Sequence, residues 1–106
     1  MKKQNEVYVS FDIEADGRIP GYNSMLSIGA AAFVLTGDAV TDRRPINIFA
    51  ANILPLPGAV ADKDTAEWWL TQPKAWKAAT EDAHPAEVQV PRLVWWLNQL
   101  PGKPIF

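Results

Sequence analysis

The stretch FDIEADG, from Phe11 to Gly17, places the carboxylates Asp12 and Glu14 two residues apart, just before an Asp-Gly turn. Residues i and i+2 of a strand point to the same side, about 6.5 Å apart along it, so the two acids would share one patch. Two like charges this close repel each other unless a cation offsets them, and Mg²⁺ and Mn²⁺ prefer oxygen ligands. The pair is therefore a candidate catalytic metal site.

A solvated strand end is the alternative interpretation of the same triplet. Asp12 and Glu14 would then lie on an exposed face that leads into a hairpin at Asp16-Gly17, since short motifs often occur without function. Two acids are also too few for a two-metal centre, which needs one bridging carboxylate and others that flank it. Against this alternative, the next two predicted strands look apolar on both sides. The first strand would then lie inside the sheet, where unpaired acids are costly.

The composition indicates a globular chain of 106 residues, one domain in size, with 48% hydrophobic residues for a core. The formal net charge of -2 gives no general attraction for nucleic acid, so phosphate binding needs a cation or a local basic patch. The absence of cysteine excludes disulfides and thiolate sites, and the single His84 excludes a multi-histidine metal site. Because no apolar span has membrane-crossing length, we expect a cytoplasmic protein with no membrane partner.

Three strands are predicted in the first half of the chain. Residues 6–14 alternate between apolar and polar, residues 25–35 are apolar at nearly every position, and residues 46–54 form a third apolar run. Short connections that contain Gly and Pro favour a three-stranded antiparallel meander.

Helices are predicted in the second half of the chain. Asp64 or Thr65 can cap a helix that carries Trp68 and Trp69, and residues 73–79 form a second short helix that starts with proline.

A third helix is predicted to have Pro91 at its first position. Its apolar stripe, at helical spacing, should face the core and consists of Leu93, Trp96, Leu97 and Leu100. Trp95 lies outside this stripe, so we expect it to cover another element.

In this order the residues resemble the DEDD, or DnaQ-like, 3'-5' exonucleases of the ribonuclease H-like fold. VSFDIEADG resembles the first exonuclease motif, LSIGAAAF the second strand, and NILPLPG the exit from the third strand. The stretches TAEWWLTQP and VPRLVWWLNQL resemble the helices that follow. The implied fold class is α/β, ribonuclease H-like, with a three-stranded antiparallel meander followed by helices. Since the chain matches only the first half of that domain, residues 1–106 are expected to be a single partial domain, truncated before the remaining strands.

The resemblance implies a metal-dependent 3'-5' exonuclease that hydrolyses phosphodiester bonds with two Mg²⁺ or Mn²⁺ ions. Asp12 would contact both ions and Glu14 one of them. The remaining acids and the general base would lie beyond a strand that should begin near Ile105, and His84 matches no such position. We therefore expect His84 to be a surface turn residue and the 106-residue chain to be inactive alone.

The implied substrate is the 3' end of single-stranded RNA or DNA, with an exoribonuclease favoured and the choice left open. Ala15, Asp16 and Gly17 would touch the terminal nucleotide. Trp68 is the candidate for base stacking, because adjacent helical positions are about 100° apart and the pair cannot both face the core. The alternative is that both Trp residues serve packing only. A homodimer also stays open.

Two other interpretations remain. A non-catalytic nucleic-acid or protein interaction module would use an open sheet edge that receives a partner strand. Another ribonuclease H-like enzyme, such as an endonuclease or transposase, would use a different set of acids, although the Ile-Gly-Ala strand and the Trp-rich helices argue mildly against it. Arg43-Arg44 is more typical of a solvated loop than of a phosphate clamp.

Overall fold

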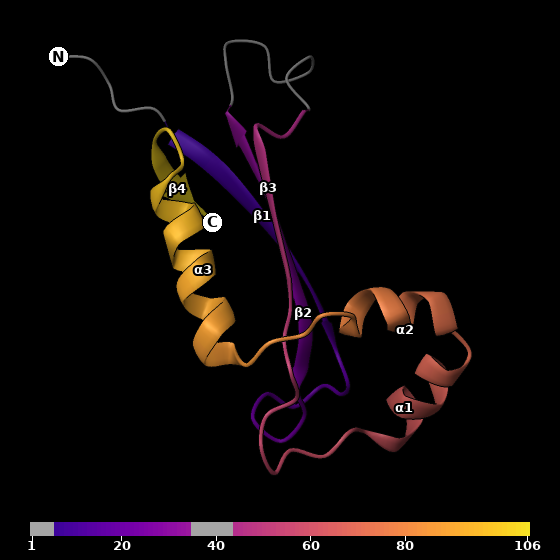
Figure 1. The fold of residues 1–106 in the computed structure, drawn as a ribbon. Helices are drawn as coiled ribbons and strands as arrows, with labels where there is room; N and C mark the ends of the chain where they lie inside the picture. Colours follow the sequence, from indigo (N-terminus) through magenta and orange to yellow (C-terminus); the bar gives the residue numbers. More distant parts are fainter. Residues whose placement is uncertain (1–5, 35–43) are drawn as a thin grey trace, which may run out of the picture.

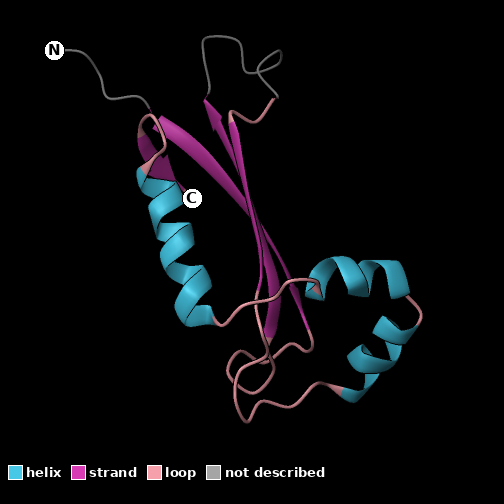
Figure 2. Ribbon diagram, in the orientation of Figure 1, coloured by secondary structure: helices cyan, strands magenta, loops and turns pink. Residues whose placement is uncertain are grey.

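The computed structural model describes residues 6–34 and 44–106, and the predicted strand end at Leu35 and the side chain of Arg43 lie outside these ranges. In chain order the elements are β1 (Glu6–Ala15), β2 (Met25–Val34), β3 (Asn47–Asn52), α1 (Lys63–Leu70), α2 (Pro73–Thr80), α3 (Ala86–Asn98) and β4 (Lys103–Ile105). Figures 1 and 2 show a mixed α/β arrangement of one four-stranded sheet and three helices. None of these helices is both long and apolar enough to cross a membrane.

The sheet has the strand order β3-β2-β1-β4. Antiparallel pairing of β1 with β2 and of β2 with β3 confirms the predicted meander. β4 confirms the strand expected near Ile105 and pairs in parallel with the start of β1, from Glu6 to Tyr8. Beyond Tyr8, residues 9–15 of β1 have no strand partner on this side within the described part of the chain.

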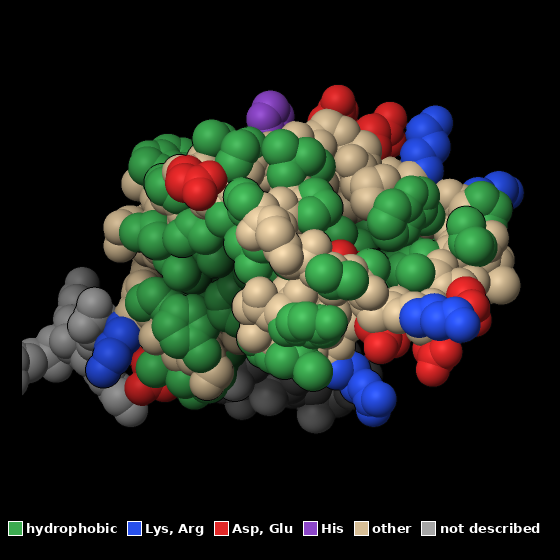
Figure 3. Space-filling model, turned by 90° about the horizontal axis from the view of Figure 1, so that it is seen from below, with side chains coloured by type: hydrophobic (Ala, Val, Ile, Leu, Met, Phe, Trp, Pro, Cys, Tyr) green, Lys and Arg blue, Asp and Glu red, His purple; other side chains and the backbone are tan. Residues whose placement is uncertain are grey.

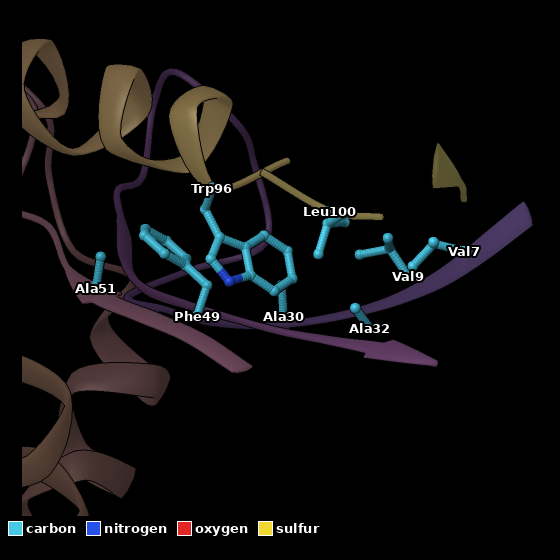
Figure 4. Close-up of a cluster of buried hydrophobic side chains, with 8 residues drawn as sticks. All are labelled: Val7, Val9, Ala30, Ala32, Phe49, Ala51, Trp96 and Leu100. Atoms are coloured by element: carbon cyan, nitrogen blue, oxygen red, sulfur yellow. The ribbon is translucent and has the colours of Figure 1, made fainter. Parts of the chain in front are cut away.

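One face of the sheet carries the main core. Because side chains of a strand alternate between faces, Val7 and Val9 of β1 point to the same side as their neighbours on β2 and β3. Figure 4 shows α3 laid over this face, with the indole of Trp96 against the ring of Phe49 at a centroid distance of 5.8 Å. The buried cluster consists of Val7, Val9, Ala30, Ala32, Phe49, Ala51, Trp96 and Leu100.

The prediction that the second and third strands are buried on both sides is wrong. In β3, buried Phe49 and Ala51 alternate with exposed Ile48 and Ala50, and in β2 the buried Ala30 and Ala32 both lie on the α3 face. The other face of β2 carries Gly29, Ala31 and Phe33, and within the described part of the chain no helix covers most of its length. Apolar composition therefore does not establish a second buried face here.

Helix α3 begins at Ala86, so the prediction that Pro91 starts it is wrong. Proline removes the N–H that would bond to the carbonyl four residues earlier, yet the helix continues because buried side chains lie on both sides of it, Gln89 before and Trp96 after. The predicted core stripe is confirmed, with Leu100 buried and Leu93 and Leu97 packed against the cluster.

Trp95 does not cover another element as expected. Its side chain is 64% exposed, whereas that of the adjacent Trp96 is 6% exposed. One step of about 100° around the helix separates a core position from a solvent position.

Helices α1 and α2 pack on the other side of the sheet from α3, near the end of β1 and the start of β2 (Figure 1). Their small core joins Leu26, Trp69 and Ala79. The predicted start of α2 at Pro73 is confirmed, but the cap of α1 is Asp62 and neither Asp64 nor Thr65. The N-cap residue of a helix has extended backbone, and here that residue is Asp62, so the helix begins at Lys63.

Replacing Trp96 with alanine should lower the free energy of unfolding by about 3–5 kcal/mol, because it empties the centre of the core. Trp96→Phe should cost much less, since the indole N–H is buried without a hydrogen-bond partner among the described residues and its loss offsets part of the lost packing. Urea unfolding of the variants measures both effects.

Trp95→Ala is the matched control, one position away on the same helix and exposed. It should change the free energy of unfolding by no more than about 0.5 kcal/mol. Equal losses for Trp95→Ala and Trp96→Ala would contradict the assigned packing of α3.

Candidate metal and nucleotide site

Asp12 and Glu14 lie on the face of β1 opposite the α3 core, and both are exposed. Regular antiparallel pairing sets Asp12 against Gly29 and Glu14 against Ser27, and the register shifts only after Glu14. The prediction that the two acids share one face is therefore confirmed. The small Gly29 and Ser27 beside them leave the surface around the carboxylates open.

The prediction that the first strand places these acids where unpaired charges are costly is wrong. β1 does lie between β2 and β4 in the strand order, but the face that carries Asp12 and Glu14 is exposed to solvent. Desolvation therefore puts no cost on the charges, and only their mutual repulsion favours a cation.

Two carboxylates supply hard oxygen ligands of the type that Mg²⁺ and Mn²⁺ accept, but only part of a coordination shell. Across residues 6–34 and 44–106, no group of three or more His, Cys, Asp or Glu side chains could hold a metal ion. His84 has an exposed side chain, as predicted, and its main chain bridges to the end of β3, with its N–H donating to the carbonyl of Asn52 at 3.1 Å. The residues present thus fit one side of a divalent-ion site.

The residues directly after the acids, Ala15 and Asp16, are tied into the fold by main-chain hydrogen bonds. The carbonyl of Ala15 accepts the indole N–H of Trp69 at 3.1 Å. The N–H of Asp16 donates to the carbonyl of Ser24 at 3.0 Å, and the carbonyl of Asp16 accepts the N–H of Asp62 at 2.8 Å. Asp16 as a residue is 8% exposed, and its carboxylate accepts the N–H of Ser24 at 2.5 Å.

Gly17 is required by close packing. A Cβ atom at this position would overlap the side-chain amide of Asn23. That amide is itself fixed, because it donates to the carbonyl of Val60 at 2.6 Å and accepts the N–H of Ile19 at 3.0 Å. The loop from Ala15 to Gly17 is thus held in one shape, and its contact with a nucleotide stays a prediction.

Trp68 and Trp69 divide as the helical spacing predicts. Trp69 is 5% exposed, whereas Trp68 is 52% exposed and lies edge-on to Trp69 at a centroid distance of 4.9 Å. Trp68 lines a hollow of about 310 Å³ together with Glu14 and Ser27. The structure therefore brings together Trp68 and one of the two predicted metal-binding acids.

Sequence reasoning missed Arg18, which shares a second hollow, of about 360 Å³, with Trp68 and Asp64. Its place directly after the Asp-Gly turn was the available signal. Arg44, by contrast, is exposed, which is compatible with the solvated loop predicted for it.

Asp62 was also missed, although Asp is a preferred N-cap residue whose side chain can accept the N–H of the third helical residue, here Thr65. Its carboxylate accepts the hydroxyl of Thr65 at 2.8 Å and the backbone N–H of Thr65 at 3.0 Å. These bonds, in that order, lower the pKa of Asp62, and the charge of Arg18 acts in the same direction. The cap fixes the start of the helix that presents Trp68.

Comparison of the chain with models of known protein families found no match, and comparison with curated proteins found none either.

Asp62→Ala should destabilise the chain at neutral pH, because it removes the cap of α1. A lowered folded-state pKa means that this stabilisation is complete above the ordinary Asp pKa and is lost as the pH falls through the lowered value. Urea unfolding of the chain and the variant at several pH values should therefore show a difference that shrinks in acid.

Glu67→Ala, on the exposed side of the same helix, is the control and should not reproduce this pH dependence. A difference between the chain and Asp62→Ala that stays constant from about pH 7 to about pH 2 would show that the charge of Asp62 has no role in the cap.

Proposed function

We propose that this chain carries part of the active site of a metal-dependent 3'-5' exonuclease of the ribonuclease H-like superfamily. The observation that carries the proposal is the placement of Asp12 and Glu14 side by side on an open sheet face, with the exposed indole of Trp68 lining the hollow next to Glu14. The four-stranded mixed sheet, in which β4 runs parallel to β1, supports the superfamily assignment.

Asp12 and Glu14 are the residues that would hold Mg²⁺ or Mn²⁺. A bound divalent ion would supply a water of lowered pKa and charge stabilisation for a phosphodiester. The two carboxylates also keep this face negative, so a phosphate approaches it only when their charge is compensated. A bound divalent ion would thus allow a chain with a net charge of -2 to bind a polyanionic substrate.

Trp68 would orient the 3' end of a single-stranded RNA or DNA substrate. A half-exposed indole offers a flat apolar face on which any base can stack, which positions the strand without reading its sequence. The partner is thus proposed to be a nucleic acid end, with RNA favoured by the resemblance of the paired-Trp helix to exoribonuclease-like members.

A second candidate function, an interaction module, is favoured by one specific observation. Residues 9–15 of β1 have no strand partner on the β4 side within the described chain, and Phe11 and Ile13 beside this edge are about half exposed. An extended partner segment could add main-chain hydrogen bonds there.

Titration of the ¹⁵N-labelled chain with Mn²⁺ tests the metal site. Paramagnetic broadening should centre on the amide signals of residues 12–14 and of the paired Ser27 and Gly29, because these lie nearest the two carboxylates. Asp12→Asn or Glu14→Gln should weaken the effect by about tenfold or more in Mn²⁺ concentration, since each removes a charged oxygen ligand.

Glu6→Gln is the matched control, on the same strand face but at its far end, and should leave the broadening unchanged. Broadening that survives in the Asp12→Asn, Glu14→Gln double variant would remove the basis of the proposal.

The 106-residue chain alone should release no nucleotides from a 3'-labelled single-stranded oligonucleotide with Mg²⁺ or Mn²⁺. Two carboxylates cannot complete a two-metal centre, and the described residues contain no third ligand nearby. Release that depends on metal and disappears in Asp12→Ala would show that the chain is catalytically sufficient.

A further inference from the structure

A cavity of about 410 Å³ lies between the α1–α2 pair and the loops that leave β1 and β3. Its walls are mainly apolar and include Leu26, Leu70 and Pro73. Asp12, Glu14 and Trp68 are not among the described residues that line it, so the cavity is distinct from the proposed metal site, although Trp69 lines both this cavity and the hollow beside Glu14. Its volume is sufficient for a small ligand with one ring.

Two indoles form part of the wall. Trp69 and Trp76 both line the cavity, with ring centroids 5.4 Å apart in an edge-on arrangement. Trp69 is held in place by the hydrogen bond from its indole N–H to the carbonyl of Ala15. Indole is the aromatic side chain that attracts cations most strongly.

Asp16 is the one charged side chain among the described residues that line this cavity. It is more than nine-tenths buried, and within the described chain its carboxylate accepts a single hydrogen bond, from the N–H of Ser24. Acidic side chains are almost never buried to this degree without a charged or strongly hydrogen-bonding partner. The carboxylate can accept further hydrogen bonds and carries a negative charge, which favours a cationic ligand.

We propose that the cavity binds a small organic cation, an ammonium group on an apolar body, with the charge placed between Asp16 and the indoles of Trp69 and Trp76. An inorganic divalent ion does not fit, because it needs six or more oxygen ligands and the walls are apolar. A neutral apolar ligand would fill the volume but leave the carboxylate without a partner. Figure 3 shows the end of the molecule from below, where hydrophobic side chains form much of the surface and most charged side chains lie around the rim.

The test compares two ligands of nearly equal shape, phenethylammonium and the neutral 2-phenylethanol, on the unaltered chain. Calorimetry gives the affinities, and the indole N–H signals of Trp69 and Trp76 report the place of binding. We expect the ammonium to bind at least about tenfold more tightly and to shift both signals. Equal affinity, or no shift at millimolar ligand, would overturn the proposal without reference to any variant.

Variants then assign the binding to the cavity. Trp76→Leu should weaken phenethylammonium binding by about tenfold, whereas Trp95→Leu, which changes an exposed indole on α3, should not. Asp16→Asn keeps an oxygen for the N–H of Ser24 and should abolish the preference for ammonium over alcohol. Unchanged affinity in Trp76→Leu would contradict the assignment to this cavity.

The same chemistry could come from a lysine of another protein. The tripeptide Gly-Lys-Gly, with blocked termini, therefore serves as a further ligand. Weaker binding than that of phenethylammonium supports a free small cation, and tighter binding would overturn that assignment in favour of a docking site for a lysine side chain. The Mn²⁺ titration is read at other residues than the cavity experiment. A failure of the cavity proposal would therefore not count against the proposed nuclease site.

Discussion

The packing of α3 on one face of the sheet is the constraint on which the rest of the structure depends. Trp96 and Leu100 cover Val7, Val9 and Phe49, and this fixes which side of β1 points inward. Since the side-chain period of a strand is two, a slip of one residue would turn Asp12 and Glu14 to the α3 side of the sheet and move the buried valines into water. The packing of Val7 and Val9 at one end of β1 thus fixes the face on which Asp12 and Glu14 lie at the other end.

A second set of contacts carries this register to the helices on the other side. The carbonyls of Ala15 and Asp16 accept hydrogen bonds from the indole of Trp69 and the N–H of Asp62, so both ends of α1 are bonded to the last residue of β1 or to the residue after it. Trp68 follows from this arrangement, because burying Trp69 turns its neighbour outward beside Glu14. Glu14 and Trp68 are far apart in the sequence, and packing and hydrogen bonds bring them together.

How much could be predicted from the sequence differs by element for physical reasons. The alternation of β1 and the proline at the start of α2 are local signals, and the structure confirms the strand and the helix start, although only Val7 and Val9 of the alternating apolar residues are buried. Pro91 misled because the packing of Gln89 and Trp96 outweighs the loss of one helical hydrogen bond. The apolar run of β2 misled because alanine and glycine are tolerated on an uncovered face. For the candidate site, the shared face of the acids was predictable, while their exposure and the hollow beside Trp68 depend on where α1 and α2 pack.

The exposure of Asp12 and Glu14 determines how strongly their two charges repel each other. Two charges about 6.5 Å apart in water repel each other by only about 0.6 kcal/mol, so an open strand tolerates Asp12 and Glu14 without any bound ion. Charge alone therefore does not distinguish a metal site from a solvated strand. The proposal therefore depends on the neighbours, because Gly29 and Ser27 have small side chains and Trp68 adds an apolar wall at the Glu14 end. In the proposed function, this half-exposed indole is the surface on which a base would stack.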